Sequence, residues 1–135
     1  MKVLIACEES QEVCKAFRAL GHDAYSCDLL PCSGGHPEWH LQCDVLTILD
    51  NGWDLMIAHP ECTRLTNAGA RWLKVPPPGK TLLQMWGGLF SGAEFYKKLR
   101  NAPIPRKAIE NPIMHCHATE LIKPVNRQVV QPWWF

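Results

Sequence analysis

Short apolar runs alternate with amphipathic or polar stretches along this chain. Four of the runs are typical of buried parallel strands, and they lie at residues 2–7, 22–27, 54–58 and 107–109. A fifth candidate strand covers residues 125–131. Residues 13–20 and 82–99 carry apolar positions at helical spacing, and Ser10 precedes the first of these helices as a candidate N-cap. This alternation predicts an α/β fold with a mostly parallel sheet and helices on both faces.

Two longer stretches show no clear period. Residues 29–43 combine proline, glycine and histidine and are expected to form a loop, followed by a short helical turn from Asp44. Residues 59–80 contain three consecutive prolines and are expected to be irregular, as in a lid or a binding loop. With 135 residues and no internal repeat, the chain is expected to form one domain, residues 1–135.

Composition narrows the class of protein. Apolar residues make up 47% of the chain and charged residues 20%, as in ordinary globular domains, and no apolar run is long enough to cross a bilayer. The N-terminal apolar run, VLIAC, is followed at once by two glutamates, which is typical of a strand and not of a signal peptide. The seven cysteines are therefore expected to be free thiols in a cytoplasmic protein with no membrane partner.

Charge is distributed unevenly, although the net charge is only +1. Residues 1–62 carry three basic and ten acidic side chains, a balance of −7, whereas residues 63–135 carry eleven basic and three acidic ones, a balance of +8. This asymmetry favours separate acidic and basic surfaces with different partners. The alternative is that both halves contribute to one sheet and that their charges neutralise each other across it.

Polar side chains follow several of the predicted strands. Glu8, Asp28, Asp44, Cys62 and Glu110 each come soon after an apolar run. Because ligands bind beyond the carboxyl ends of parallel strands, these residues are expected to converge at one edge of the sheet. Each also has a simpler interpretation: Cys62 as an ordinary buried cysteine, Glu110 as a helix cap or an ion-pair partner, and Asp44 as an N-cap.

The order of these motifs resembles that in the DNA cytosine-5 methyltransferases. DLMIAHPECTRLT resembles the strand and loop that carry the family's Pro-Cys nucleophile, and PRKAIENP resembles the strand that carries its Glu-Asn pair. CKAFRALGHD and QCDVL resemble the first helix after the cofactor loop and the acidic motif near the cofactor adenine. The resemblance spans residues 2–131 and extends to short phage-encoded methyltransferase-like proteins. It implies a Rossmann-like methyltransferase fold that is truncated at the C-terminus.

The resemblance implies methyl transfer from S-adenosylmethionine to cytosine in DNA. Cys62 would add to C6 of the base, Glu110 would place a carboxyl group at N3, and Asn111 would fix the loop of Glu110. The target base would have to leave the DNA helix to reach them. Asp28 would bond the cofactor ribose, and Asp44 would lie near its adenine. The full set expected to contact the cofactor is Cys7, Glu8, Ser10, Asp28, Leu29, Asp44 and Pro60.

Three departures from the family favour an alternative. The cofactor loop CEESQEV has no glycine, although side chains there hinder the close approach of a cofactor. Glu61 replaces the proline before the nucleophile, and its charge is expected to raise the pKa of Cys62. The family's later motifs and recognition domain have no counterpart, and the apolar ending QPWWF is expected to be a truncation or a contact with a partner or a second copy. The alternative is a catalytically inactive binding protein for a nucleotide-like ligand or a protein, such as a phage counter-defence factor.

A third hypothesis is a metal-stabilised structural module. Cys32, His36, His40 and Cys43 are ligand types that zinc accepts. Their spacing matches no standard zinc finger, so zinc is a minor alternative and no metal site is predicted.

Overall fold

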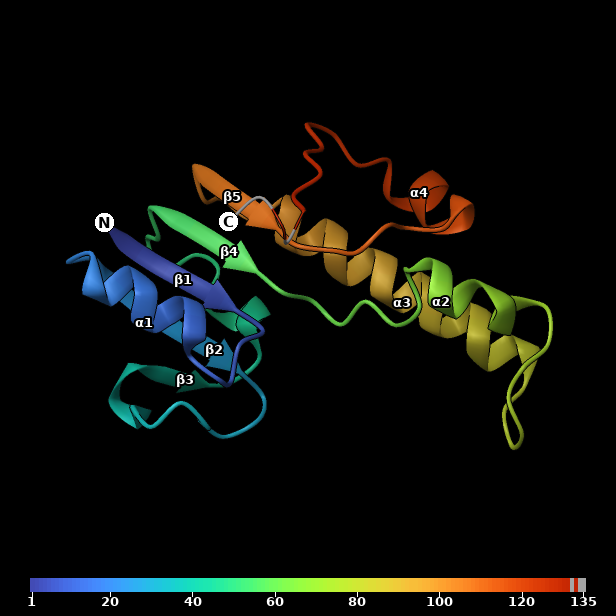
Figure 1. Cartoon of the computed structure of the whole chain (residues 1–135), viewed down its shortest axis with the longest axis horizontal. Helices are drawn as coiled ribbons and strands as arrows, with labels where there is room; N and C mark the ends of the chain where they lie inside the picture. Colours follow the sequence, from blue (N-terminus) through green and yellow to red (C-terminus); the bar gives the residue numbers. More distant parts are fainter. Residues whose placement is uncertain (132, 134–135) are drawn as a thin grey trace.

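Five parallel strands form a single sheet in this computed structural model, which describes residues 1–131 and Trp133. The strands are β1 (Lys2–Ala6), β2 (Asp23–Asp28), β3 (His40–Gln42), β4 (Leu55–Ala58) and β5 (Arg106–Ile109). Their order across the sheet is β3-β2-β1-β4-β5, and every neighbouring pair is parallel (Figure 1). The predicted α/β class and parallel sheet are confirmed. Because the order starts at β1 and grows outward in both directions, it reverses between β1 and β4.

The structure has four α-helices and three named 3-10 helices within residues 1–131. The α-helices are α1 (Glu12–Ala19), α2 (Asn67–Ala70), α3 (Leu82–Arg100) and α4 (Cys116–Ile122). The 3-10 helices are η1 (Pro37–Trp39), η2 (Val45–Thr47) and η3 (Arg71–Leu73). Within the described residues, none of these helices combines the length and the hydropathy that crossing a bilayer requires.

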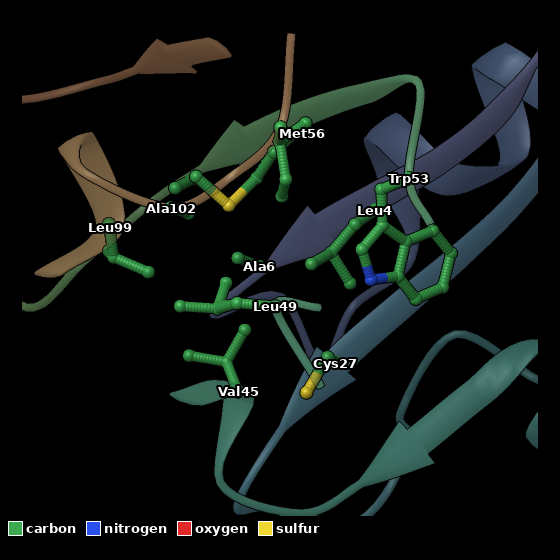
Figure 2. Packing of buried hydrophobic residues seen from close by; sticks show 11 residues of the cluster. Leu4, Ala6, Cys27, Val45, Leu49, Trp53, Met56, Leu99 and Ala102 are labelled. Atoms are coloured by element: carbon green, nitrogen blue, oxygen red, sulfur yellow. The ribbon is translucent and has the colours of Figure 1, made fainter. Parts of the chain in front are cut away.

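Alternate side chains of β1 enter two different cores. Val3 and Ile5 pack against Cys14 of α1 on one face of the sheet. Leu4 points to the other face and packs in a cluster that includes Leu99, near the end of α3 (Figure 2). All five residues are fully buried. Burial on both faces explains the uninterrupted apolar run in β1, and the prediction of helices on both faces is confirmed.

A third core lies beyond the sheet, around the first half of α3. Figure 1 shows α2 and α4 alongside the part of α3 that extends away from the strands. There Leu89 of α3 packs with Ala118 and Ile122 of α4 and with Leu65. Leu65 belongs to the segment at residues 59–66 that follows β4. This segment therefore leads from the sheet to the helical core, and it carries Cys62.

The structure corrects three of the predicted elements. The loop expected at residues 29–43 contains η1 and β3, because pairing with β2 orders a three-residue strand whose sequence shows no period. The irregular segment expected at residues 59–80 contains α2 and η3. The strand predicted at residues 125–131 is wrong, since these residues form neither strand nor helix. Asn126 there has φ of 52°, which interrupts an extended run, and its valine neighbours are exposed.

The predicted N-cap at Ser10 is also wrong. Gln11 precedes α1 in the left-handed conformation, with φ of 62°, and no side chain caps the helix from that position. The carboxylate of Glu8 takes this role, because it accepts hydrogen bonds from the backbone N–H groups of Val13 at 2.7 Å and Cys14 at 3.2 Å. A negative charge is favoured at this end of a helix.

The predicted contact through the apolar ending falls largely outside the described residues. Of residues 131–135, only Gln131 and Trp133 are described, and Trp133 is 75% exposed.

Candidate functional site

The carboxyl ends of all five strands lie at one edge of the sheet, where the predicted polar residues follow them. Backbone pairing continues one residue past the strands and fixes these positions. The N–H groups of Glu8, His59 and Glu110 donate to carbonyl groups of the neighbouring strands at 3.1, 2.9 and 2.9 Å. His59 follows β4 and bonds to Ala6 of β1, so it lies at the reversal of strand order. In open parallel sheets this is the position where ligands bind.

Cys62 and Glu110 come from different strands but lie close enough to interact. Burial raises the pKa of the Cys62 thiol above its ordinary value, and the charges of Glu110 and then Glu61 raise it further. The expected effect of Glu61 is therefore confirmed, and the resting state of Cys62 is the neutral thiol. A thiolate is the attacking species. Cys62 therefore has to lose its proton as it attacks, or the charges of Glu110 and Glu61 have to be neutralised so that its pKa falls.

His59 is the residue at this site that the sequence analysis did not select. Its Nδ1 lies 4.0 Å from Oε2 of Glu110, which makes an ion pair when the ring is protonated. Its Nε2 is buried and has no hydrogen-bond partner among the described residues, and the same is true of Oδ1 of Asn111. Asn111 donates from Nδ2 to the carbonyl of Pro112. The only sequence signal for His59 was its position directly after β4.

Glu110 is less enclosed than its sequence context predicted. The strand before it was expected to be buried, but β5 is the edge of the sheet, and Arg106, Lys107 and Ala108 are exposed. The Glu110 side chain is 58% exposed. Its carboxylate is therefore open to solvent on one side and faces His59 and Cys62 on the other.

A surface hollow of about 750 Å³ lies beside Cys62. Its wall combines apolar and polar groups from three segments: Cys62, Thr63, Thr66, Asn67, Ala68, Gly69, Arg71, Trp72, Pro112 and Ile113. The Arg71 guanidinium lies over the Trp72 ring, 4.1 Å from its centroid. Glu110 does not line this hollow, so Cys62 and Glu110, although both lie beyond the carboxyl ends of the strands, do not share it.

His115 fastens the segment that carries Cys62. Its Nδ1 accepts a hydrogen bond from the N–H of Ala118 at 3.2 Å, so the proton of the neutral ring is on Nε2, which donates to the carbonyl of Arg64 at 2.9 Å. The N–H of His115 also donates to Leu65. Cys62 itself closes a turn, since its carbonyl accepts from Leu65 at 2.8 Å. These contacts hold the candidate nucleophile on ordered backbone.

The residues predicted to bind the cofactor form a second group, across the reversal from Cys62. Burial raises the pKa of the Cys7 thiol to about 11, and the charges of Asp28 and Asp44 raise it further, so both carboxylates act on this thiol. Asp28 accepts from the N–H of Leu30 at 2.9 Å. Asp44 accepts from Leu46 at 3.0 Å as the N-cap of η2, which confirms its simpler interpretation and leaves its second oxygen available.

The remaining members of the predicted cofactor set are placed less favourably for contact. The Glu8 carboxylate is buried under α1 and engaged by backbone N–H groups. Leu29 is 71% exposed, Ser10 is half-buried and Pro60 is buried. Of the predicted cofactor residues, Asp28 and Asp44 therefore act on Cys7. No such interaction links Glu8, Ser10, Leu29 or Pro60 to this thiol among the described residues.

A glycine in another loop packs closely against CEESQEV. A Cβ added at Gly34 would lie 2.3 Å from the carbonyl oxygen of Ser10, so only glycine fits there. Gln11, fully buried, holds the same loop through hydrogen bonds with Cys32 and with the backbone of His36. The two loops therefore pack against each other at the amino end of α1.

The four candidate zinc ligands are engaged with separate partners. Cys32 donates to Gln11, and the ring of His36 stacks on Trp39. The ring nitrogens of His40 bond to Ser26 and to the carbonyl of Leu30, and Cys43 lies against Cys27. In the part of the chain that the structure describes, no group of three or more His, Cys, Asp or Glu side chains has a geometry that would hold a metal ion.

No protein-family model, curated protein or solved structure matches this chain. The functional assignment therefore rests on the geometry of the two residue groups and on the chemistry that each can perform.

The proximity of Glu110 to Cys62 leads to a first prediction. Glu110→Gln removes one of the charges that disfavour the thiolate, so the pKa of Cys62 falls and its thiolate fraction at pH 8 rises. We expect iodoacetamide to alkylate Cys62 severalfold faster in this variant, as measured by mass spectrometry of the peptide that contains Cys62. The matched control is Glu120→Gln, an exposed acid on α4, which should leave the rate unchanged. Equal rates in Glu110→Gln and the wild type would show that the two side chains do not interact.

Proposed function

We propose that this protein is a cytosine-5 methyltransferase-like protein that binds S-adenosylmethionine and acts on cytosine in DNA. The observation that carries the proposal is that the charge of Glu110 acts on the Cys62 thiol at the carboxyl edge of the sheet, across the reversal of strand order from Asp28 and Asp44. The strand order supports a Rossmann-like methyltransferase fold, because 3-2-1-4-5 is the order of the first five strands of a doubly wound sheet, and ligands bind at the reversal in such sheets.

The group of Cys7, Asp28 and Asp44 fits the chemistry of S-adenosylmethionine. Carboxylates accept hydrogen bonds from ribose hydroxyl groups and an adenine amino group, and their charge suits a sulfonium cation. Because Glu8 already occupies the N–H groups at the start of α1, this helix end is closed to a diphosphate. The site therefore favours a cationic nucleoside over a dinucleotide. When bound, S-adenosylmethionine supplies the methyl group.

Cys62, Glu110 and His59 supply the chemistry on the base. Cys62 loses its proton to solvent water, and its sulfur then adds to C6 of cytosine, which makes C5 nucleophilic. Glu110 donates a hydrogen bond or a proton at N3 and so relieves the charge that builds on the ring. His59, 4.0 Å from Glu110, stabilises the carboxylate when its ring is protonated. After methyl transfer, loss of the C5 proton and of the sulfur restores the aromatic ring.

The distribution of charge supports DNA as the partner. Residues 63–80, which include α2 and η3, carry Arg64, Arg71, Lys74 and Lys80 and no acidic side chain. Arg71 lines the hollow beside Cys62, and Arg64 lies two residues after Cys62. A basic surface around the candidate nucleophile suits the phosphate backbone of DNA.

A second candidate function is binding without catalysis. It is favoured by the raised pKa of Cys62, to which burial contributes most and the charges of Glu110 and Glu61 contribute further. In this case the acidic group of Cys7, Asp28 and Asp44 would still hold a nucleotide-like ligand, or the hollow would hold a protein partner, and Cys62 would not react.

Calorimetric titration with S-adenosylmethionine tests the shared part of both proposals. We expect saturable binding by the wild type, and Asp44→Asn is expected to weaken it by about 10-fold, because a hydrogen bond to a charged group is lost. This variant keeps an oxygen that can cap η2, so its fold should be retained. The control is Asp50→Asn, an exposed acid after η2, which should bind like the wild type. Absence of heat at millimolar ligand would rule out the methyltransferase proposal.

A further inference from the structure

Two cysteine thiols lie in contact immediately before the two candidate cofactor carboxylates. The Sγ atoms of Cys27 and Cys43 are 3.9 Å apart, and the Cys27 thiol is also 3.4 Å from the carbonyl oxygen of Cys43. Cys27 is fully buried in the main core of the sheet, whereas Cys43 is half-buried. Asp28 follows the first cysteine and Asp44 the second.

Backbone geometry at the end of β3 creates this contact. Cys27 pairs with Leu41 in the parallel register of β2 and β3. The N–H of Cys43 then donates to the carbonyl of Leu41 at 3.0 Å, which closes a tight turn and returns the chain towards β2. The turn holds the Cys43 side chain against Cys27, so the two sulfur atoms need to move by only about 2 Å to reach bonding distance.

We propose that Cys27 and Cys43 form a site of reversible oxidative modification, in which a peroxide converts the two thiols to a disulfide. Cys43, the more accessible thiol, attacks one peroxide oxygen, which gives a sulfenic acid and releases one molecule of water from hydrogen peroxide. The sulfur of Cys27 then displaces hydroxide from the sulfenic sulfur, and the hydroxide takes the Cys27 proton and leaves as a second water. Both thiols are oxidised by one electron each, and the peroxide is reduced by two.

The assignment of roles follows from burial. Burial raises the pKa of the Cys27 thiol to about 12, and the neighbouring Cys43 contributes to this rise. Cys27 therefore remains a thiol at neutral pH and is the resolving partner, not the sulfur that meets the oxidant first. A third thiol, Cys7, also influences Cys27, but Cys43 is the cysteine in direct contact with it.

The disulfide would join the backbone at the end of β2 to the turn before η2. These are the positions that set the separation of Asp28 and Asp44. If the proposed binding of S-adenosylmethionine is correct, oxidation changes the affinity for this ligand, and this consequence rests on the proposed function. Formation of the disulfide itself does not depend on it.

Peptide mapping of the folded protein after treatment with hydrogen peroxide tests the modification. Cleavage before aspartate separates residues 23–27 from residues 28–43, so a disulfide between them appears as two joined peptides that dithiothreitol releases. We expect this product in the wild type and in Cys32→Ser, which removes the other cysteine of the second peptide, and its loss in Cys43→Ser. The oxidised wild type should also melt about 5 °C above the peroxide-treated Cys43→Ser variant.

Two results would overturn the proposal. One is peroxide treatment that oxidises the exposed Cys116 but leaves Cys27 and Cys43 as thiols in the folded protein. The other is a link that forms only after unfolding in guanidinium chloride. Calorimetry with S-adenosylmethionine on the reduced and oxidised forms tests disulfide formation and ligand binding separately. If the disulfide forms but the reduced protein does not bind the ligand, only the proposed function is refuted.

Discussion

Replacing Gly69 by alanine is expected to destabilise the protein by about 2–4 kcal/mol, since the added methyl group meets backbone that cannot move aside. A Cβ at this position would lie 2.1 Å from the carbonyl oxygen of Thr63 and 3.4 Å from the Cα of Arg64. Gly69 is buried in α2, directly against the segment that follows Cys62. Urea denaturation should report the loss of stability, and faster alkylation of Cys62 should report displacement of its segment.

The matched control is Gly87→Ala. Gly87 also lies within a helix, α3, but a Cβ there would have no atom within 4 Å. Because alanine has the higher helix propensity, this variant should be more stable than the wild type by about 1 kcal/mol. If both variants gained stability, α2 would not pack on the Cys62 segment as described, and the ordered setting of the nucleophile would be refuted.

The framework of the fold could be predicted because burial on two faces leaves a strong mark in the sequence. β1, β2, β4 and α3 have either an uninterrupted apolar run or a helical period, and each was predicted within one or two residues. β3 and α2 leave no such mark, since HLQ and NAGA are too short to show a period. They are ordered by tertiary contacts, β3 by pairing with β2 and α2 by close approach to Thr63.

The same contrast applies to the candidate site. Cys62, Glu110 and Asp28 could be selected because each lies at or soon after the end of a predicted strand, and topology alone brings strand ends to one edge. The roles of Glu8 and His115 could not be predicted, because each depends on a hydrogen bond whose geometry is set by the fold. Glu8 caps α1 from outside the helix, and His115 joins two segments that are 51 residues apart in the chain.

Both candidate groups share one electrostatic feature, which is a cysteine whose thiolate is disfavoured by carboxylates. Asp28 and Asp44 act on Cys7, and Glu110 and Glu61 act on Cys62. At Cys7 the two carboxylates are compatible with a cation-binding role, since their negative charge attracts a sulfonium cation. At Cys62 the two carboxylates are a barrier to reaction, which substrate binding has to lower by protonating Glu110 or engaging it with the base.

DNA that contains 5-fluorocytosine is expected to become covalently attached to the wild-type protein through Cys62 when S-adenosylmethionine is present. Addition of the sulfur to C6 and transfer of the methyl group leave fluorine at C5, where a proton would otherwise be lost. The ring cannot regain its aromatic form, so the bond to sulfur persists. The adduct is detected as a protein–DNA band that survives denaturing electrophoresis.

Three variants make this experiment decisive. Cys62→Ser should form no adduct, whereas Cys116→Ser, which changes an exposed cysteine on α4, should form as much as the wild type. Glu110→Gln should form the adduct about 100-fold more slowly, because the group that relieves charge at N3 is gone, even though its Cys62 is alkylated faster. If Glu110→Gln slows adduct formation but speeds alkylation of Cys62, Glu110 assists the reaction of the base. If the variant speeds both reactions, Glu110 only suppresses the thiolate through its charge. If S-adenosylmethionine binds and the wild type still forms no adduct, Cys62 is not the nucleophile and the protein acts by binding alone.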